Sequence, residues 1–282
     1  MGEERTVRYA AELMRLRAEW STQGWSDIDG DRALWLWCQV AWLRAGALSE
    51  QETVALAVEI EALRPVLSRI PQKIDAASDA LRAVRTVRAW AYATDDSACL
   101  SATSSYIHEI YQSVEDARPT RADLATWVEV LRLCGEGPAA DGHPAVGLLA
   151  ARAVAALMND FFDVERSTFC SHATPGLYEE EDGIAAELTV QLEAVDALVG
   201  EAVRCCDTRL LNWTLERAQA MALDAEPGGR VAEQMRRIAL RAWLHGRGPW
   251  TKEWIDRPWG QDDRSILYAR MVSLSAACAW LD

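Results

Sequence analysis

The segment Asn159–Ser167 (NDFFDVERS) combines the side chains in this sequence that are best suited to chemistry. We expect the apolar helix that begins at Ala145 to run past Phe162, so that Asn159, Asp163 and Ser167 lie four residues apart on one helix face. Amide, carboxylate and hydroxyl oxygens suit Mg²⁺, which commonly shares its remaining positions with substrate phosphates. Arg166 lies beside this stripe and is expected to contact a phosphate oxygen. The pattern predicts a magnesium–phosphate site; the alternative is a helix that emerges into solvent, with Asp163 and Arg166 as a weak surface pair.

Other site chemistries have less support in the sequence. The four histidines are isolated, and the seven cysteines include no CxxC pair, so a zinc site or a disulfide framework is not expected. There is no glycine-rich phosphate loop, nucleophile elbow or dinucleotide fingerprint. The chain has 13 tryptophans and three phenylalanines. These rings are either ordinary core residues or the lining of a pocket for an apolar or cationic ligand, for which the candidates are Trp35, Trp42, Phe162 and Trp250.

The elements that must position these residues are helices. Alanine, leucine, glutamate and arginine dominate long stretches of the chain, and runs of alternating β-branched residues are essentially absent. We predict an all-α fold of about ten helices or more in one domain over residues 1–282, because no long linker divides the chain. The expected helices are Glu4–Gln23, Asp31–Leu43, Ser49–Arg64, one that follows Pro71 and runs through Trp90 towards Thr94, Ala98–Asp116, Asp123–Leu133, one from Ala145 past Phe162, Ile184–Cys206, Thr208–Leu223, Arg230–Leu244 and a last one through Trp280.

Composition limits the partners. The formal net charge of −14 disfavours nucleic acid as the main ligand, because the phosphate backbone is repelled on average. No window approaches the roughly 18–20 apolar residues of a membrane span, and the N-terminus has no apolar signal core. We expect a cytoplasmic protein with reduced thiols. The oligomeric state, monomer or homodimer, stays open.

At these residues the sequence resembles the class I terpene synthases. Their second metal motif has an Asn, a hydroxyl residue four positions later and a Glu four positions after that, with a basic diphosphate contact just before the Glu. On that pattern Asn159 and Arg166 match, Asp163 replaces the hydroxyl residue, and Ser167 replaces the Glu. The change at Asp163 also resembles the second aspartate motif of trans-prenyltransferases.

Two further stretches agree with this family in their order along the chain. Arg118–Trp127, the following helix and the Gly135–Pro144 loop are similar to the segment that precedes the family's diphosphate-sensing helix break, which makes Arg132 the candidate sensor. Trp250–Arg257 resembles the closing motif, whose arginine, here Arg257, reaches the diphosphate.

The first aspartate-rich motif of the family has two candidate registers here. Asp95 and Asp96 follow an apolar helix but lie close to Asn159 in sequence. The favoured register places the motif on the Ala33–Arg44 helix, where Leu48–Gln51 resembles bacterial ent-kaurene-synthase-like enzymes. In that register the aspartates are replaced, and the first metal cluster is either missing or rebuilt from Asp27, Asp29 and Asp31 or from Asp95 and Asp96.

The resemblance implies a helical bundle around a central apolar cavity. It also implies an Mg²⁺-dependent lyase that ionises a prenyl diphosphate, with a diterpenyl substrate favoured, and cyclises or quenches the carbocation. Asn159, Asp163 and Ser167 would be the metal ligands, and Arg132, Arg166 and Arg257 would bind the diphosphate, with Arg166 and Arg257 assisting catalysis. The alternative is a catalytically inactive relative that binds a ligand or partner. Chain length of the substrate, whether it is linear or bicyclic, and the product are not readable from the sequence.

Overall fold

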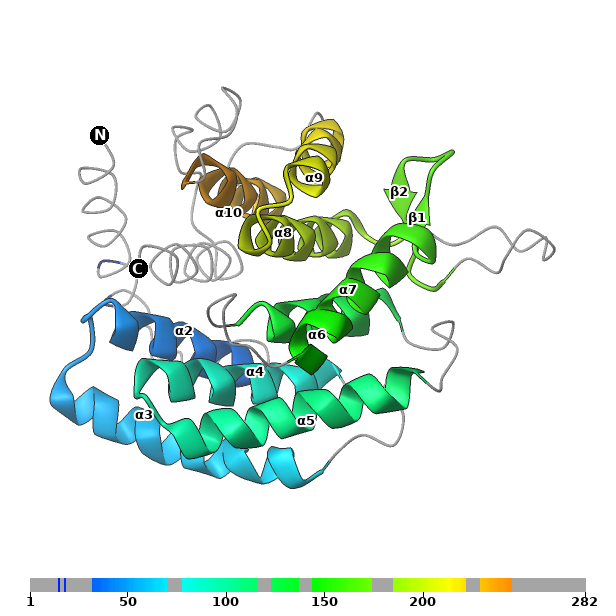
Figure 1. The fold of residues 1–282 in the computed structure, drawn as a ribbon. Coiled ribbons are helices and arrows are strands. Elements are labelled where there is room, and N and C mark those ends of the chain that lie inside the picture. The colour runs from blue at the N-terminus through cyan, green and yellow to red at the C-terminus, as the bar shows by residue number, and fades with distance from the viewer. Residues whose placement is uncertain are drawn as a thin grey trace. The chain divides into compact units, whose positions relative to one another are not determined.

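The fold is all-α, as the sequence predicts. The computed structural model describes residues 15, 18, 32–69, 78–115, 123–136, 144–173, 185–221 and 229–244. These residues are mostly helical, and they include one small antiparallel sheet of two strands (Figure 1). Contacts divide the described helices into two compact units.

The first unit contains three described helices. They are α2 (Arg32–Arg44), α3 (Glu50–Leu63) and α10 (Arg230–Leu244). The predicted capping box at the start of α3 is confirmed: the backbone N–H of Ser49 donates to Glu52 Oε2 at 2.8 Å, and the N–H of Glu52 donates to Ser49 Oγ at 3.3 Å. An ion pair between Arg32 and Glu59 links α2 to α3.

The second unit contains the remaining elements between Leu63 and Met221. They are the short 3₁₀ helix η1 (Arg64–Ser68), α4 (Ser78–Ala93), α5 (Ser97–Glu115), α6 (Leu124–Cys134), α7 (Pro144–Asn159), β1 (Phe162–Asp163), β2 (Thr168–Phe169), α8 (Leu188–Arg204) and α9 (Thr208–Met221). Apart from α7, the described helices lie close to the predicted ranges. The predicted helices Glu4–Gln23 and the one through Trp280 lie outside the described residues, apart from Arg15 and Ala18.

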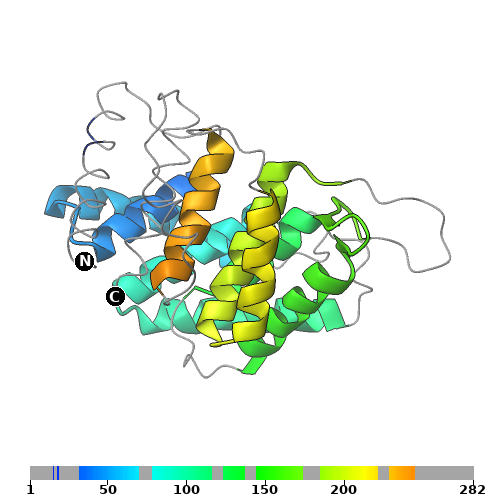
Figure 2. The same ribbon diagram turned by 90° about the horizontal axis from the view of Figure 1, so that it is seen from above.

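Helix α6 is the central element of this second unit. It contacts α4, α7 and α8, and α8 in turn packs along α9, as the two views show (Figures 1 and 2). The helix begins at a capping aspartate, because Asp123 Oδ1 accepts the backbone N–H of Thr126 at 2.8 Å. Its apolar residues, including Trp127 and Leu131, are buried. Its acidic residue Glu129 is buried together with them.

None of the helices in the described parts of the chain is long and apolar enough to cross a membrane.

Candidate functional site

Helix α7 ends earlier than predicted. Its last residue is Asn159, and the backbone N–H of Phe161 then bonds to the carbonyl of Ala156, five residues back instead of four. The expected helix past Phe162 is therefore wrong. Phe161 is 0% exposed and Phe162 is 7% exposed. The physical reason is that Phe162 pairs with Phe169 and packs against Trp213, contacts that the hairpin makes.

A two-stranded hairpin replaces the predicted helical stripe. Phe162 pairs with Phe169 and Asp163 with Thr168 in register. The rings of Phe162 and Phe169 meet edge to face, with centroids 5.1 Å apart, and Trp213 of α9 lies 4.9 Å from the Phe162 ring. Aromatic pairs of this geometry add to the stability that burial already supplies. The hairpin therefore belongs to a packed aromatic cluster, and Phe162 lies in that cluster.

The predicted metal ligands consequently do not share a helix face. Asn159 is exposed at the end of α7, Asp163 lies on β1, and Ser167 is exposed in the turn with a left-handed φ of 52°. The left-handed region is unusual for a residue with a side chain, so Ser167 acts here as a turn residue. The prediction of one oxygen-bearing stripe on a single helix is wrong, because the helix stops at its first member.

Asp163 and Arg166 nevertheless lie together. Asp163 Oδ1 accepts the backbone N–H of Arg166 at 3.0 Å, and Asp163 Oδ2 lies 3.7 Å from Arg166 Nε. The Asp163 side chain is 19% exposed and that of Arg166 is 46% exposed, so both reach the protein surface. The turn thus holds a carboxylate and a guanidinium side by side, a few residues beyond Asn159.

Asp160, between Asn159 and the hairpin, is partly buried. Burial raises the pKa of its carboxyl group, and the nearby charge of Arg152 offsets part of that rise. Within the described residues, no group of three or more histidine, cysteine, aspartate or glutamate side chains is placed to hold a metal ion. Any cation at this turn would therefore need amide or substrate oxygens in addition to carboxylates.

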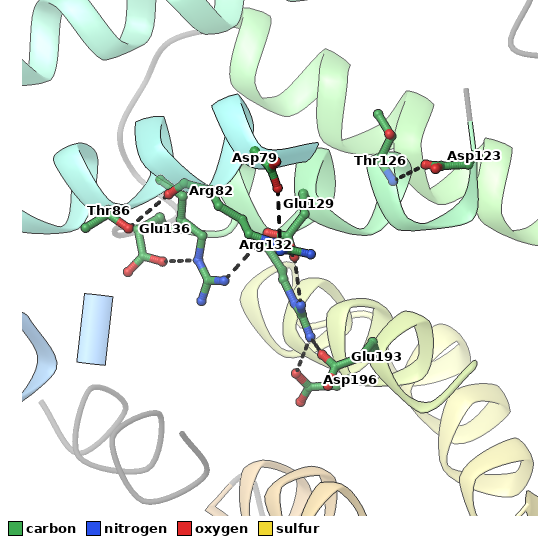
Figure 3. Close-up of polar contacts among 11 residues, drawn as sticks. Asp79, Arg82, Thr86, Asp123, Thr126, Glu129, Arg132, Glu136, Glu193 and Asp196 are labelled. Atoms are coloured by element: carbon green, nitrogen blue, oxygen red, sulfur yellow. Dashed lines mark hydrogen bonds and ion pairs between the residues drawn. The ribbon is translucent and has the colours of Figure 1, made fainter. Parts of the chain in front are cut away.

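Arg132, the candidate diphosphate sensor, lies in a buried ionic network between α4, α6 and α8 (Figure 3). Its guanidinium contacts Glu129 Oε1 at 3.0 Å, Asp196 Oδ2 at 3.4 Å and the carboxylate of Glu193. Glu193 and Asp196 lie more than 60 residues further along the chain. Three carboxylates therefore surround the guanidinium that the resemblance assigns to a diphosphate.

Glu129 is the centre of that network. Its side chain is 4% exposed, and Arg82 Nε of α4 lies 3.2 Å from the same Oε1 that contacts Arg132. Arg85 Nη1 approaches Glu129 Oε2 at 3.9 Å, and Arg85 Nε bonds to Glu136 at 3.0 Å. Burial alone raises the pKa of Glu129, but the charges of Arg132, Arg85 and Arg82 together hold the pKa below its ordinary value. The carboxylate is therefore ionised inside the unit.

This pKa direction predicts an acid-sensitive contribution to stability. Because the folded pKa of Glu129 is below the unfolded value of about 4.3, its stabilisation is fully present above that pH and is lost as pH falls through the folded pKa. We expect the difference in unfolding free energy between the wild type and Glu129→Gln to be constant from about pH 6 to about pH 5, and to shrink as the pH falls below the unfolded pKa of about 4.3. Urea unfolding at several pH values measures it. A difference that stays constant from about pH 6 to about pH 3 would contradict a lowered pKa of Glu129.

Three other candidate residues, Trp35, Trp42 and Asp96, contact neighbouring protein residues in the structure. Trp35 and Trp42 of α2 pack edge to face with centroids 5.4 Å apart, and Trp42 is 3% exposed. Asp96 pairs with Arg64 at 2.5 Å and accepts the backbone N–H of Cys99 at 3.0 Å, so it caps α5. The bond from Cys99 is the main reason that the pKa of Asp96 is lowered.

Several predicted site residues lie outside the described residues. They are Arg257 and Trp250, together with Asp27, Asp29 and Asp31. Their assignments stay predictions. Asp95, which is described, is exposed and has a left-handed φ of 54° in the turn between α4 and α5.

The sequence analysis did not predict the ionic network around Glu129 and Arg132, although the sequences of α6 and α8 contain a signal for it. Glu129 and Arg132 interrupt the apolar run of α6 at a spacing of three, and Glu193 and Asp196 do the same in α8. Charged residues in mostly apolar helices are buried only when they are paired, so such interruptions in two helices predict a shared network.

No family model, curated protein or solved structure matches this chain.

Proposed function

We propose that this chain is a magnesium-dependent lyase of the class I terpene synthase kind. It would ionise a prenyl diphosphate, with a diterpenyl substrate favoured, and its carbocation would be cyclised or quenched to a terpene. The observation that best supports this proposal is the pairing of Asp163 and Arg166 on the turn that follows Asn159. A carboxylate for a metal and a guanidinium for a phosphate are the two groups that such a site needs side by side.

The chemistry of these donors fits magnesium. The Asn159 amide oxygen and the Asp163 carboxylate would hold the ion, and the backbone N–H of Arg166 already orients the carboxylate as an outer hydrogen-bond donor does in metal sites. Bound magnesium would supply positive charge to the departing diphosphate. Arg166 would bind a phosphate oxygen and stabilise the same developing negative charge.

A second candidate function is a catalytically inactive relative that binds a ligand or partner. Two observations favour it: α7 ends at Asn159, which separates the expected ligands, and Arg132 is surrounded by Glu129, Glu193 and Asp196. If those carboxylates hold Arg132 permanently, the sensor function of the family is absent and the residue is structural.

Turnover distinguishes the two functions. The full chain is incubated with Mg²⁺ and, in separate reactions, with geranylgeranyl, farnesyl or bicyclic diterpenyl diphosphate, and products are identified by gas chromatography and mass spectrometry. We expect a hydrocarbon or alcohol from at least one substrate. Diphosphate binding that depends on Mg²⁺ but gives no product supports the inactive relative instead, and the absence of both binding and product rejects the resemblance.

Substitutions on the hairpin assign the activity to this site. Asp163→Asn is expected to lower kcat/KM on the order of 100-fold, because it removes the charged metal ligand and keeps the shape. The matched control is Glu165→Gln, which removes a carboxylate from an exposed position on the same turn. Equal losses in both variants would show that the general charge of the turn matters instead of a metal ligand at Asp163.

A further inference from the structure

Arg217 of α9 stands out among the arginines of this acidic chain. Acidic residues outnumber lysine and arginine by 43 to 29, so most inward-facing arginines are expected to find a carboxylate. Arg82, Arg85, Arg132, Arg204 and Arg236 all do so. Arg217 is partly buried, yet within the described residues its guanidinium has no carboxylate partner, and its Nε atom is buried without a hydrogen-bond acceptor.

Two aromatic rings hold Arg217 in place. Its guanidinium carbon lies 5.6 Å from the centroid of Phe162 and 5.6 Å from that of Trp213. The two rings meet edge to face, with their centroids 4.9 Å apart. Ring contacts satisfy the charge of a guanidinium but not its N–H donors, which radiate in the plane of the group. The structure therefore holds a cation that is packed against two rings and whose Nε–H has no acceptor.

Arg217 lies on the aromatic face of the hairpin. Successive residues of a strand point to opposite faces, and Phe162 pairs with Phe169 while Asp163 pairs with Thr168. Arg217 contacts Phe162, so it lies on the face opposite to that of Asp163. It is therefore separate from the pairing of Asp163 and Arg166 that supports the proposed function, and the inference does not depend on that function.

We infer that Arg217, held against Phe162 and Trp213, forms a binding site for an oxyanion of the phosphate or carboxylate type. The two terminal nitrogens of a guanidinium match two oxygens of such a group. The rings that pack against Arg217 restrict its side chain before binding, so binding costs less conformational entropy. The site requires no metal, because the positive charge comes from the side chain itself.

The test measures anion binding to the full chain in a buffer from which divalent metal ions have been removed with a chelating resin. Magnesium is absent, so diphosphate held through a metal at Asp163 does not contribute. Isothermal titration with inorganic phosphate, diphosphate and, as a carboxylate probe, citrate is expected to give saturable binding of at least one anion. Comparing the affinities of the three anions shows whether the site prefers a phosphate or a carboxylate group. No saturable binding of any of them overturns the inference.

Matched variants locate the binding. Arg217→Gln is expected to weaken binding by at least about tenfold, the size of one lost charged hydrogen bond, and Arg217→Lys, which keeps the charge and loses the fork, should give an intermediate loss. The control is Arg209→Gln, an exposed arginine on the same helix. If Arg217→Gln fails to fold by circular dichroism, Arg217→Lys decides alone. Equal binding in the wild type and the Arg217 variants, or an equal loss in Arg209→Gln, rejects the site.

Discussion

Replacing Glu129 by glutamine is expected to destabilise the protein by about 3–5 kcal/mol, the usual cost of removing one partner from a buried ionic group. Glutamine keeps the volume of the side chain but removes the charge that Arg82, Arg85 and Arg132 share. Three guanidiniums would then face one another with fewer carboxylates between α4, α6 and α8. Urea unfolding at pH 7, followed by circular dichroism, measures the change in unfolding free energy.

The control for this prediction is Asp79→Asn. Asp79 also pairs with Arg82, at 3.8 Å, but its side chain is 98% exposed. Solvent screens such a pair, so its loss should change stability by less than about 0.5 kcal/mol. A small effect at Glu129 as well would show that the arginines find other partners, and the network would then be less specific than its geometry indicates.

Replacing Trp127 by alanine is expected to cost about 3–5 kcal/mol, because it leaves a cavity at the centre of the second unit. Trp127 is 0% exposed, and its helix α6 contacts α4, α7 and α8, so no single neighbour can move to fill the space. The same urea unfolding experiment measures the loss, provided that the variant retains its helical circular dichroism spectrum.

A second substitution separates volume from hydrogen bonding at the same position. The indole N–H of Trp127 is buried and has no acceptor among the described residues. Trp127→Phe therefore removes no hydrogen bond, and most of the space is still filled, so we expect a loss of only about 1–2 kcal/mol. A loss as large as that of the alanine variant would indicate that the indole N–H has a partner after all.

At the candidate site, local sequence patterns predicted the types of the residues but not their relative placement. The types of residue at Asn159, Asp163 and Arg166 were readable as oxygen donors and a phosphate-binding cation. Their relative placement was not, because it depended on whether the helix continued. That choice was made by contacts between Phe162 and residues further along the chain, Phe169 and Trp213, which no periodicity in the segment itself encodes.

The sequence by itself determined the all-α class and, within a few residues, most of the described helices. Helix formation depends on neighbours three and four residues apart and on caps such as the Ser49–Glu52 box, which are local and therefore readable. Tertiary structure alone decided where α7 ends and which charges meet. Arg132 could have faced a ligand or a carboxylate, and only the packing of α6 against α8 brings Glu193 and Asp196 to it. Long-range pairing of buried charges follows from the packing of whole helices, and a helix pattern does not specify its neighbours.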